Sequence, residues 1–308
     1  MIFRPLEPGD RIALVAPSSP FDTDKFHRAC RLIEESGFDV IPGKHVHRKR
    51  GYLVGTEADR AEDLIGAVTD PTVAAIIGIR GGYGSGRLLP WLPFSTLKKF
   101  PKIFLGHSDI TFLHLAFQSQ MQWVTFHGPN LVDLDTVPER WENVLRSLTG
   151  ENDFSWDINQ FQVLRCGRAS GPLTGGNLTC LTHLIGTPYL PDLTGALLLV
   201  EDCNEALYRL DRLLLHLRLA GILERLGGLI LGRFQGCGDS DKIWEMVMEA
   251  TKPFGFPVIA NLPFGHTLEN QVIPFGLAFT LDTHAGSFHP LRLPFSRALP
   301  KNNPAGEQ

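Results

Sequence analysis

The first half of the chain alternates short apolar runs with amphipathic segments, and this alternation limits the possible folds more than any other feature. Residues 12–16, 76–79 and 103–105 are apolar runs of strand length, and residues 24–36 and 57–68 have helical periodicity. Strands that alternate with helices favour an open, largely parallel α/β sheet with helices on both faces. Active groups of such sheets lie at the carboxyl ends of the strands. We therefore expect any chemistry directly after an apolar run.

The alternation ends near residue 150, where polar residues and scattered aromatic residues replace it. A second series of elements follows, with a short strand near 170–174 and a leucine-rich helix predicted over 206–226. A chain of 308 residues, 43% of them apolar, is long enough to bury two cores. We predict an N-terminal α/β domain over residues 1–150 and a C-terminal, strand-rich α/β domain over residues 165–300.

The composition disfavours several classes of protein. The formal net charge of −4 provides no wide basic face, so we expect no nucleic-acid partner. The chain starts without the pattern of a signal peptide, and the run at 12–16 is too short to span a membrane, so we expect a cytoplasmic protein with no membrane partner. The five cysteines are widely spaced, with no Cys-x-x-Cys, and no His-Glu-x-x-His is present. We therefore expect reduced structural thiols, no metal site and no cofactor.

A glycine-rich segment, with glycines at 81, 82, 84 and 86, follows the apolar run and Arg80. It does not match a dinucleotide loop, because Arg87 occupies the place of the last required glycine, and it lacks the lysine of a phosphate-binding loop. Nearly bare backbone can turn sharply and point N–H groups into a cleft, as an oxyanion hole requires. The alternative is a tight turn whose glycines only satisfy the backbone geometry.

Gly106-His107-Ser108 joins the apolar run 103–105 to a helical pattern. A serine on such a turn projects its hydroxyl away from the sheet, beside the unpaired N–H groups at the start of the helix. Ser108 is therefore a candidate nucleophile. The alternative is that Ser108 or Asp109 only caps the helix. Ile110 replaces the second glycine of the G-x-S-x-G elbow, which disfavours a standard α/β-hydrolase.

Two later segments also place polar residues after apolar runs. Glu201 ends the run 197–200, where a carboxylate can orient an imidazole, although acidic residues at such places are commonly solvated or cap the next helix. His266 lies on a loop shaped by proline and glycine after a strand near 256–260. Histidine carries protons near neutral pH, which makes it a candidate base. Other histidines compete for that role, including two close to the serine, at 107 and 114.

These segments, in this order, resemble the LD-carboxypeptidase family of serine peptidases. The likeness extends over nearly the whole chain. The segments that carry it are Arg80-Gly81-Gly82-Tyr83-Gly84, Gly106-His107-Ser108-Asp109-Ile110-Thr111, Glu201-Asp202 with Tyr208-Arg209-Leu210-Asp211-Arg212, and Gly265-His266. The resemblance implies a Rossmann-like N-terminal domain that carries the nucleophile and a second α/β domain that carries the other two members of a catalytic triad.

The same resemblance implies a role for each candidate residue. Ser108 would be the nucleophile, Glu201 the acidic member and His266 the general base. The oxyanion hole would consist of the backbone N–H groups of Gly82 and Asp109. Three further residues are candidate substrate contacts by their position, namely Arg80, Tyr83 and Asn177.

The family leaves two substrate classes open. Its murein members hydrolyse the bond between the L-centre of diaminopimelate and the terminal D-alanine of a wall peptide in peptidoglycan recycling, and its microcin C immunity members cleave aminoacyl or peptidyl nucleotide conjugates with the help of an added aromatic-bearing loop. Tyr189 is the only aromatic residue between Asn177 and Glu201, which favours the small wall peptide. The resemblance also implies a homodimer. An alternative of another class is a non-catalytic protein that binds a small anion at residues 80–87.

Overall fold

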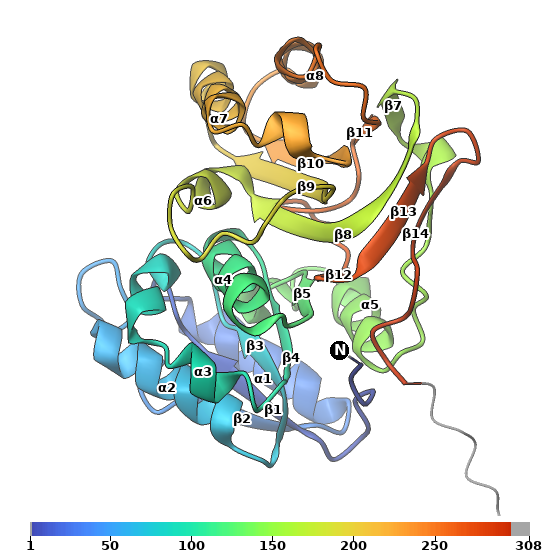
Figure 1. Ribbon diagram of the computed structural model, residues 1–308. Helices are drawn as coiled ribbons and strands as arrows, with labels where there is room; N and C mark the ends of the chain where they lie inside the picture. The colour runs from blue at the N-terminus through green and yellow to red at the C-terminus, as the bar shows by residue number, and fades with distance from the viewer. Residues whose placement is uncertain (1, 297–308) are drawn as a thin grey trace, which may run out of the picture.

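The chain folds into two lobes, each built on its own sheet (Figure 1). This computed structural model describes residues 2–296. The first lobe contains most of the N-terminal half of the chain, and the second lobe contains most of the C-terminal half. The α/β fold expected from the alternation of apolar runs and amphipathic segments is confirmed.

The first sheet has six strands in the order β12-β5-β4-β3-β1-β2. Strands β1 to β5 run parallel, and β12 pairs antiparallel with β5 at one edge. Every residue of the central strand β4 is buried. The bounds of the strands are β1 Arg11–Val15, β2 Asp39–Pro42, β3 Val73–Gly78, β4 Ile103–Gly106, β5 Thr125–His127 and β12 Ile273–Phe275.

Helices cover both faces of the first sheet because alternate residues of each strand point to opposite faces. Ile12 and Leu14 of β1 pack with α1, and Ala13 and Val15 pack with α2 and α4. Asp22 caps the start of α1 by accepting a hydrogen bond from the Lys25 backbone N–H. The helices of this lobe are α1 Thr23–Glu35, α2 Glu57–Thr69, α3 Phe94–Leu97, α4 Thr111–Met121 and α5 Pro138–Leu148, with 3₁₀ turns η1 Ser85–Trp91, η2 Ser108–Ile110 and η3 Leu131–Asp133.

The second sheet has eight strands in the order β6-β14-β13-β8-β9-β10-β11-β7. Its centre, β8 to β11, is parallel, and its flanking strands are antiparallel. The strands are β6 Trp156–Asp157, β7 Gln162–Arg165, β8 Arg168–Asn177, β9 Leu197–Cys203, β10 Gly228–Gln235, β11 Val258–Ala260, β13 Ala278–Asp282 and β14 Ser287–Pro290. The helical segments are α6 Leu178–Thr182, α7 Leu207–Leu219, α8 Ser240–Ala250, η4 Ile158–Gln160 and η5 Leu223–Arg225.

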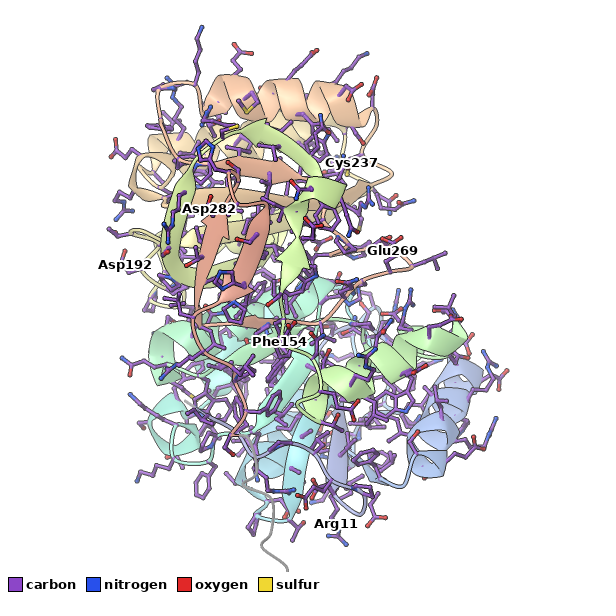
Figure 2. The ribbon with its side chains drawn as sticks, turned by 90° about the vertical axis from the view of Figure 1, so that its right-hand side faces the viewer. Arg11, Phe154, Asp192, Cys237, Glu269 and Asp282 are labelled. Atoms are coloured by element: carbon purple, nitrogen blue, oxygen red, sulfur yellow. The ribbon has the colours of Figure 1, made fainter. Side chains whose placement is uncertain are left out.

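The chain returns from the second lobe to the first at β12, and again after β14, where Phe295 pairs with Phe3 and stacks on Phe126 of β5. Residues 261–272, which we call the crossing segment, connect β11 of the second sheet to β12 of the first. Ile273 of β12 lies opposite His127 of β5, and the chain then re-enters the second sheet at β13. Figure 2 labels Glu269 on the crossing segment, near the level at which the two lobes meet. Strand β12, which follows the predicted boundary near residue 150, thus belongs to the first sheet.

The helix expected over residues 206–226 is shorter in the structure. Helix α7 ends at Leu219, and Gly221 then adopts the left-handed region with φ of 66°. The apolar pattern continues past this turn because Ile222 and Leu223 are themselves buried. The leucine-rich pattern over residues 206–226 therefore indicates buried residues both in helix α7 and in the turn that follows it.

Two other features bear on the sequence-based expectations. No helix in residues 2–296 is long and apolar enough to cross a membrane. All five cysteines lie within this range, and each is a free thiol.

Candidate active site

Ser108 lies on the turn between β4 and α4. Its φ of 65° is in the left-handed region, which is uncommon for a residue with a side chain and costs about 1–3 kcal/mol at positions of this kind. The N-cap position of η2 belongs to His107, and the Ser108 hydroxyl is hydrogen-bonded instead to His266. The geometry is that of a strained strand-to-helix turn that presents a hydroxyl, and not that of a helix cap.

The glycine loop lies directly against this hydroxyl. A Cβ on Gly81 would lie 2.7 Å from Ser108 Cβ and 2.9 Å from Ser108 Oγ, so only glycine allows the loop to approach this closely. The next residue, Gly82, has a φ of 110°. Within residues 2–296, neither the Gly82 N–H nor the Asp109 N–H donates a hydrogen bond to another protein group. Both N–H groups thus lack a protein acceptor in the described residues, as the donors of an oxyanion hole require.

The carboxylate of Asp109 connects the turn that carries Ser108 to two neighbouring loops through hydrogen bonds. It is buried, and it accepts hydrogen bonds from Ser18 Oγ at 2.5 Å and from the Ser85 N–H at 2.7 Å. The Ser85 hydroxyl in turn donates to the Asp109 carbonyl oxygen at 2.5 Å. The loop after β1, the end of the glycine loop and the serine turn are thereby joined around one side chain. The sequence did not reveal this role, because no local pattern connects residues 18, 85 and 109.

Three side chains that are distant in the sequence meet beside the turn. The imidazole of His266, on the crossing segment, is 2.9 Å from Ser108 Oγ through Nε2 and 2.7 Å from Glu201 Oε2 through Nδ1. Glu201 near the end of β9 is completely buried. Gly265, with a φ of 102°, is required beside it, since a Cβ there would lie 2.5 Å from the Glu201 carboxylate. An imidazole held in this way can accept a proton from the hydroxyl while the carboxylate stabilises the cation.

The carboxylate also sets the proton affinity of the imidazole. Burial lowers the pKa of His266, but the negative charge of Glu201 and the further interactions of the ring with Glu201 and Cys203 together raise it by more, so the net pKa lies above the usual 6.5. The neutral form, which is needed to take the serine proton, therefore increases as the pH rises.

Strand alternation separates Glu201 from its neighbour Asp202. Asp202 points to the other face of β9 and accepts hydrogen bonds from Asn177 Nδ2 at 2.8 Å and from the Thr179 N–H at 2.9 Å. Asn177 is buried, and its Oδ1 also caps α6 through the Cys180 N–H. The structure therefore places Asn177 in a hydrogen-bond network behind the site, and not in contact with Ser108.

The two histidines near the serine in the sequence have other places. His114 is fully buried and its Nε2 is 2.8 Å from the Gly106 carbonyl oxygen. His107 packs its ring edge-on against the His266 ring at 5.1 Å, and burial lowers the pKa of His107 to about 3. The uncharged ring of His107 thus packs beside the imidazole of His266 and adds no charge to the site.

Two open clefts meet at His266. One, of about 540 Å³, contains Ser108 and the glycine loop and is also lined by Lys25 and Arg80. The other, of about 670 Å³, shares His107, Asp133 and His266 with the first. Arg80 is exposed and donates to the Pro20 carbonyl oxygen. Tyr83 is half exposed and packs against Tyr52, with the ring centroids 5.7 Å apart, and it does not line either cleft.

The part of the chain that the structure describes contains no group of three or more histidine, cysteine or acidic side chains able to hold a metal ion. The chemistry available here is that of a hydroxyl, an imidazole, a carboxylate and backbone N–H groups. This is the constellation of a serine hydrolase.

Comparisons with known proteins give the same class and narrow it. Two family models match the chain, the LD-carboxypeptidase N-terminal domain over residues 12–128 and the LD-carboxypeptidase C-terminal domain over residues 170–281. The probable murein peptide carboxypeptidase of Bacillus subtilis strain 168 is 34% identical over 288 residues, which cover 90% of each chain. The microcin C7 self-immunity protein MccF of Escherichia coli is 26% identical over 320 residues, which cover 92% of this chain and 93% of that one.

A solved structure agrees with these matches. The muramoyltetrapeptide carboxypeptidase from Oxalobacter formigenes superposes with a TM-score of 0.79 at 31% identity, covering 90% of this chain and 97% of the other. The chain therefore belongs to the LD-carboxypeptidase family. It is a serine-type carboxypeptidase, a hydrolase.

Proposed function

We propose that this protein removes the terminal D-alanine from a murein tetrapeptide by hydrolysing its bond to the L-centre of diaminopimelate, as part of cytoplasmic peptidoglycan recycling. The observation that carries the proposal is the series of two hydrogen bonds from Ser108 through His266 to Glu201, at 2.9 and 2.7 Å. Such a series makes a serine hydroxyl nucleophilic near neutral pH.

In the proposed reaction, His266 Nε2 takes the proton of Ser108 as Oγ attacks the amide carbonyl carbon. The negative oxygen that forms is held by the N–H groups of Gly82 and Asp109. His266 then gives its proton to the nitrogen of the departing D-alanine, which leaves an acyl-enzyme on Ser108. Water, activated by the same imidazole, hydrolyses the acyl-enzyme and restores the hydroxyl.

The charges around the cleft suit a peptide of this kind. Lys25 and Arg80 contribute positive charge to the wall of the cleft that contains Ser108, and Asp22 and Asp133 contribute negative charge. A wall peptide that ends in diaminopimelate and D-alanine carries carboxylates and an ammonium group in its last two residues. Groups of both signs in one cleft can pair with both kinds of charge on this substrate.

The second candidate is a nucleotide conjugate, because the chain is also similar to the self-immunity protein MccF. The position of Tyr189 argues against this candidate. Its ring packs against Phe94 of α3 at 5.9 Å, and its backbone oxygen accepts a hydrogen bond from Ser119. Tyr189 is absent from both clefts at His266, so it offers no ring on which a base could stack there.

The test measures by mass spectrometry the release of D-alanine from the tetrapeptide L-Ala-γ-D-Glu-meso-diaminopimelyl-D-Ala. The matched control substrate ends in L-alanine, and an aminoacyl sulfamoyl adenylate tests the second candidate. We expect hydrolysis of the first substrate and little of the other two. Faster cleavage of the adenylate would overturn the choice of substrate while leaving the serine mechanism in place.

The nucleophile is tested in the same assay. We expect Ser108→Ala to reduce kcat by roughly 10⁴–10⁶-fold, because the attacking oxygen is removed. Ser95→Ala, which changes an exposed serine of α3, should keep full activity. Wild-type rates in a correctly folded Ser108→Ala variant would refute the assignment and would favour a protein whose serine has no chemical role. The homodimer implied by the family resemblance is tested by sedimentation of the purified protein.

A further inference from the structure

Arg140, near the start of α5, makes contacts that neither the sequence motifs nor the proposed reaction explains. It is 7% exposed. Within residues 2–296 no carboxylate lies within ion-pair distance of its guanidinium, and the Asp133 carboxylate acts on it only at longer range. A buried cation without a carboxylate partner is costly unless other groups solvate it. The contacts that replace water around this guanidinium therefore indicate what it does.

Those contacts are three backbone carbonyl oxygens and one hydroxyl, on both sides of the junction between the lobes. On the crossing segment, the guanidinium donates through Nε to the Leu268 carbonyl at 3.1 Å and through Nη2 to the Thr267 carbonyl at 3.3 Å and to the Leu268 carbonyl. On its own side, Nη1 donates to the Asp133 carbonyl at 2.7 Å and to the Thr136 hydroxyl at 2.5 Å. The two acceptors on the crossing segment immediately follow His266 in the sequence.

The helix that carries Arg140 is fixed to the first lobe. The next residue, Trp141, donates from Nε1 to Ser36 Oγ at 2.7 Å, and its ring packs edge-on against Phe38. The two ends of the crossing segment are held by their own contacts, since Leu262, Phe264 and Val272 are buried and the Gln271 N–H donates to the Pro263 carbonyl at 2.8 Å. The turn after His266 is less enclosed. Leu268 is 67% exposed, and the turn is braced by the Gly265 N–H, which donates to Asn270 Oδ1 at 2.9 Å, and by the Thr267 N–H, which donates to the Gly265 carbonyl at 2.8 Å.

We propose that Arg140 is a positioning residue for the proposed general base, which holds the residues after His266 against the first lobe so that the imidazole stays within reach of Ser108. The serine turn belongs to the first lobe, and Arg140 ties the imidazole to the same body. Arginine suits this task because its fixed fork of five N–H donors can hold several carbonyl oxygens at once, whereas a lysine ammonium is a single flexible point. This inference rests on the proposed function of Ser108 and His266.

The experiment compares Arg140→Ala and Arg140→Lys with Arg146→Ala, which changes an exposed arginine of the same helix. Loss of the clamp should lower kcat by about 10–100-fold with little change in KM, because a small misplacement of a catalytic group reduces the rate of the chemical step and not ground-state binding. Arg140→Lys should recover only part of the rate, and Arg146→Ala should keep the wild-type rate. Added methylguanidinium should partly restore kcat in Arg140→Ala.

A second readout needs no substrate and so separates this inference from the proposed function. In proton NMR of the wild-type protein, the His266 Nδ1–H that faces Glu201 should give a low-field resonance, which we expect to broaden or disappear in Arg140→Ala and Arg140→Lys and to persist in Arg146→Ala. If Arg140→Ala does not fold, Arg140→Lys alone decides both readouts. A folded Arg140 variant with wild-type kcat and an unchanged resonance would overturn the inference. If the resonance responds to the Arg140 substitutions as expected but the wild-type protein cleaves no peptide, the result counts against the proposed function only.

Discussion

The serine turn and the crossing segment contribute opposite halves of the same site, and they are built in different ways. Ser108 follows a fully buried strand and begins a helix, and the carboxylate that braces the turn is on the next residue, Asp109. His266 lies on a segment that runs between two sheets. Its imidazole is hydrogen-bonded to Glu201 on β9, and the carbonyls of the two residues after it accept hydrogen bonds from Arg140 on α5.

The two halves of the site should therefore respond differently to substitutions. The serine turn has its conformation imposed by buried neighbours, so that damage there should affect both stability and activity. The imidazole depends on contacts between lobes, so damage there should affect activity more than stability. The predictions below test this contrast.

The largest effect is expected at the carboxylate that faces the imidazole. Glu201→Gln keeps the shape of the side chain but cannot stabilise the imidazolium, and we expect kcat to fall by roughly 10⁴-fold. The charge of Glu201 raises the pKa of His266, and the protonated imidazole cannot accept the serine proton. The wild-type kcat/KM should therefore rise with pH through a midpoint above 6.5, and the midpoint of Glu201→Gln should lie at lower pH.

The fall in kcat and the midpoint of the pH profile come from kcat and kcat/KM measured separately at each pH between 5 and 10. Glu249→Gln, at an exposed glutamate of α8, is the matched control and should keep the wild-type rate and midpoint. An identical midpoint in wild type and Glu201→Gln would contradict the assigned role of the carboxylate.

An intermediate effect is expected in the glycine loop. Gly81→Ala would place a methyl group 2.7 Å from Ser108 Cβ, so either the serine or the loop with its N–H groups must move. We expect kcat to fall by roughly 10²–10³-fold, the range for loss of one oxyanion donor. The control is Gly66→Ala in α2, where an added Cβ meets no atom within 4 Å and the rate should not change. Equal rates for the two variants would mean that the loop tolerates displacement and that its N–H groups take no part.

The smallest effect, measured as stability, is expected behind the serine turn. Asp109→Ala leaves the buried Ser18 hydroxyl and Ser85 N–H without their acceptor, which should lower the free energy of unfolding by about 1–3 kcal/mol. Urea denaturation measures this change, with Asp211→Ala at an exposed position of α7 as the control. If Asp109→Ala is as stable as the control while the Arg140 variants are strongly destabilised, then stability depends on the crossing segment and not on the serine turn, which is the reverse of the expectation.

Much of the first lobe could be predicted from the sequence because its signals are local. The apolar runs at 12–16, 76–79 and 103–105 are strands of the first sheet, and the expected helices at 24–36 and 57–68 agree with α1 and α2 to within a residue at each end. The leucine-rich helix of the second lobe was overextended, since burial after Gly221 continues the same pattern without a helix.

The candidate site could be predicted in part for the same reason. Ser108, Glu201 and His266 each follow an apolar run, and the structure brings the three within hydrogen-bond distance. Arg140 could not be found, because an arginine on an amphipathic helix normally faces solvent, and two of its acceptors are backbone carbonyls more than 120 residues away. Asn177 is a candidate substrate contact by its position in the sequence, and in the structure it is buried and donates a hydrogen bond to Asp202.

By itself the sequence determined the order of strands and helices in the first lobe, the residue types able to do acyl chemistry, and their placement at strand ends, because hydrophobic periodicity and backbone preferences act over a few residues. Tertiary packing alone determines that the crossing segment returns to the first sheet, that one buried arginine donates to its carbonyl oxygens, and that an imidazole and a hydroxyl 158 residues apart lie 2.9 Å from each other. Those outcomes depend on which surfaces pack together, and packing between distant segments leaves no periodic signal in the chain.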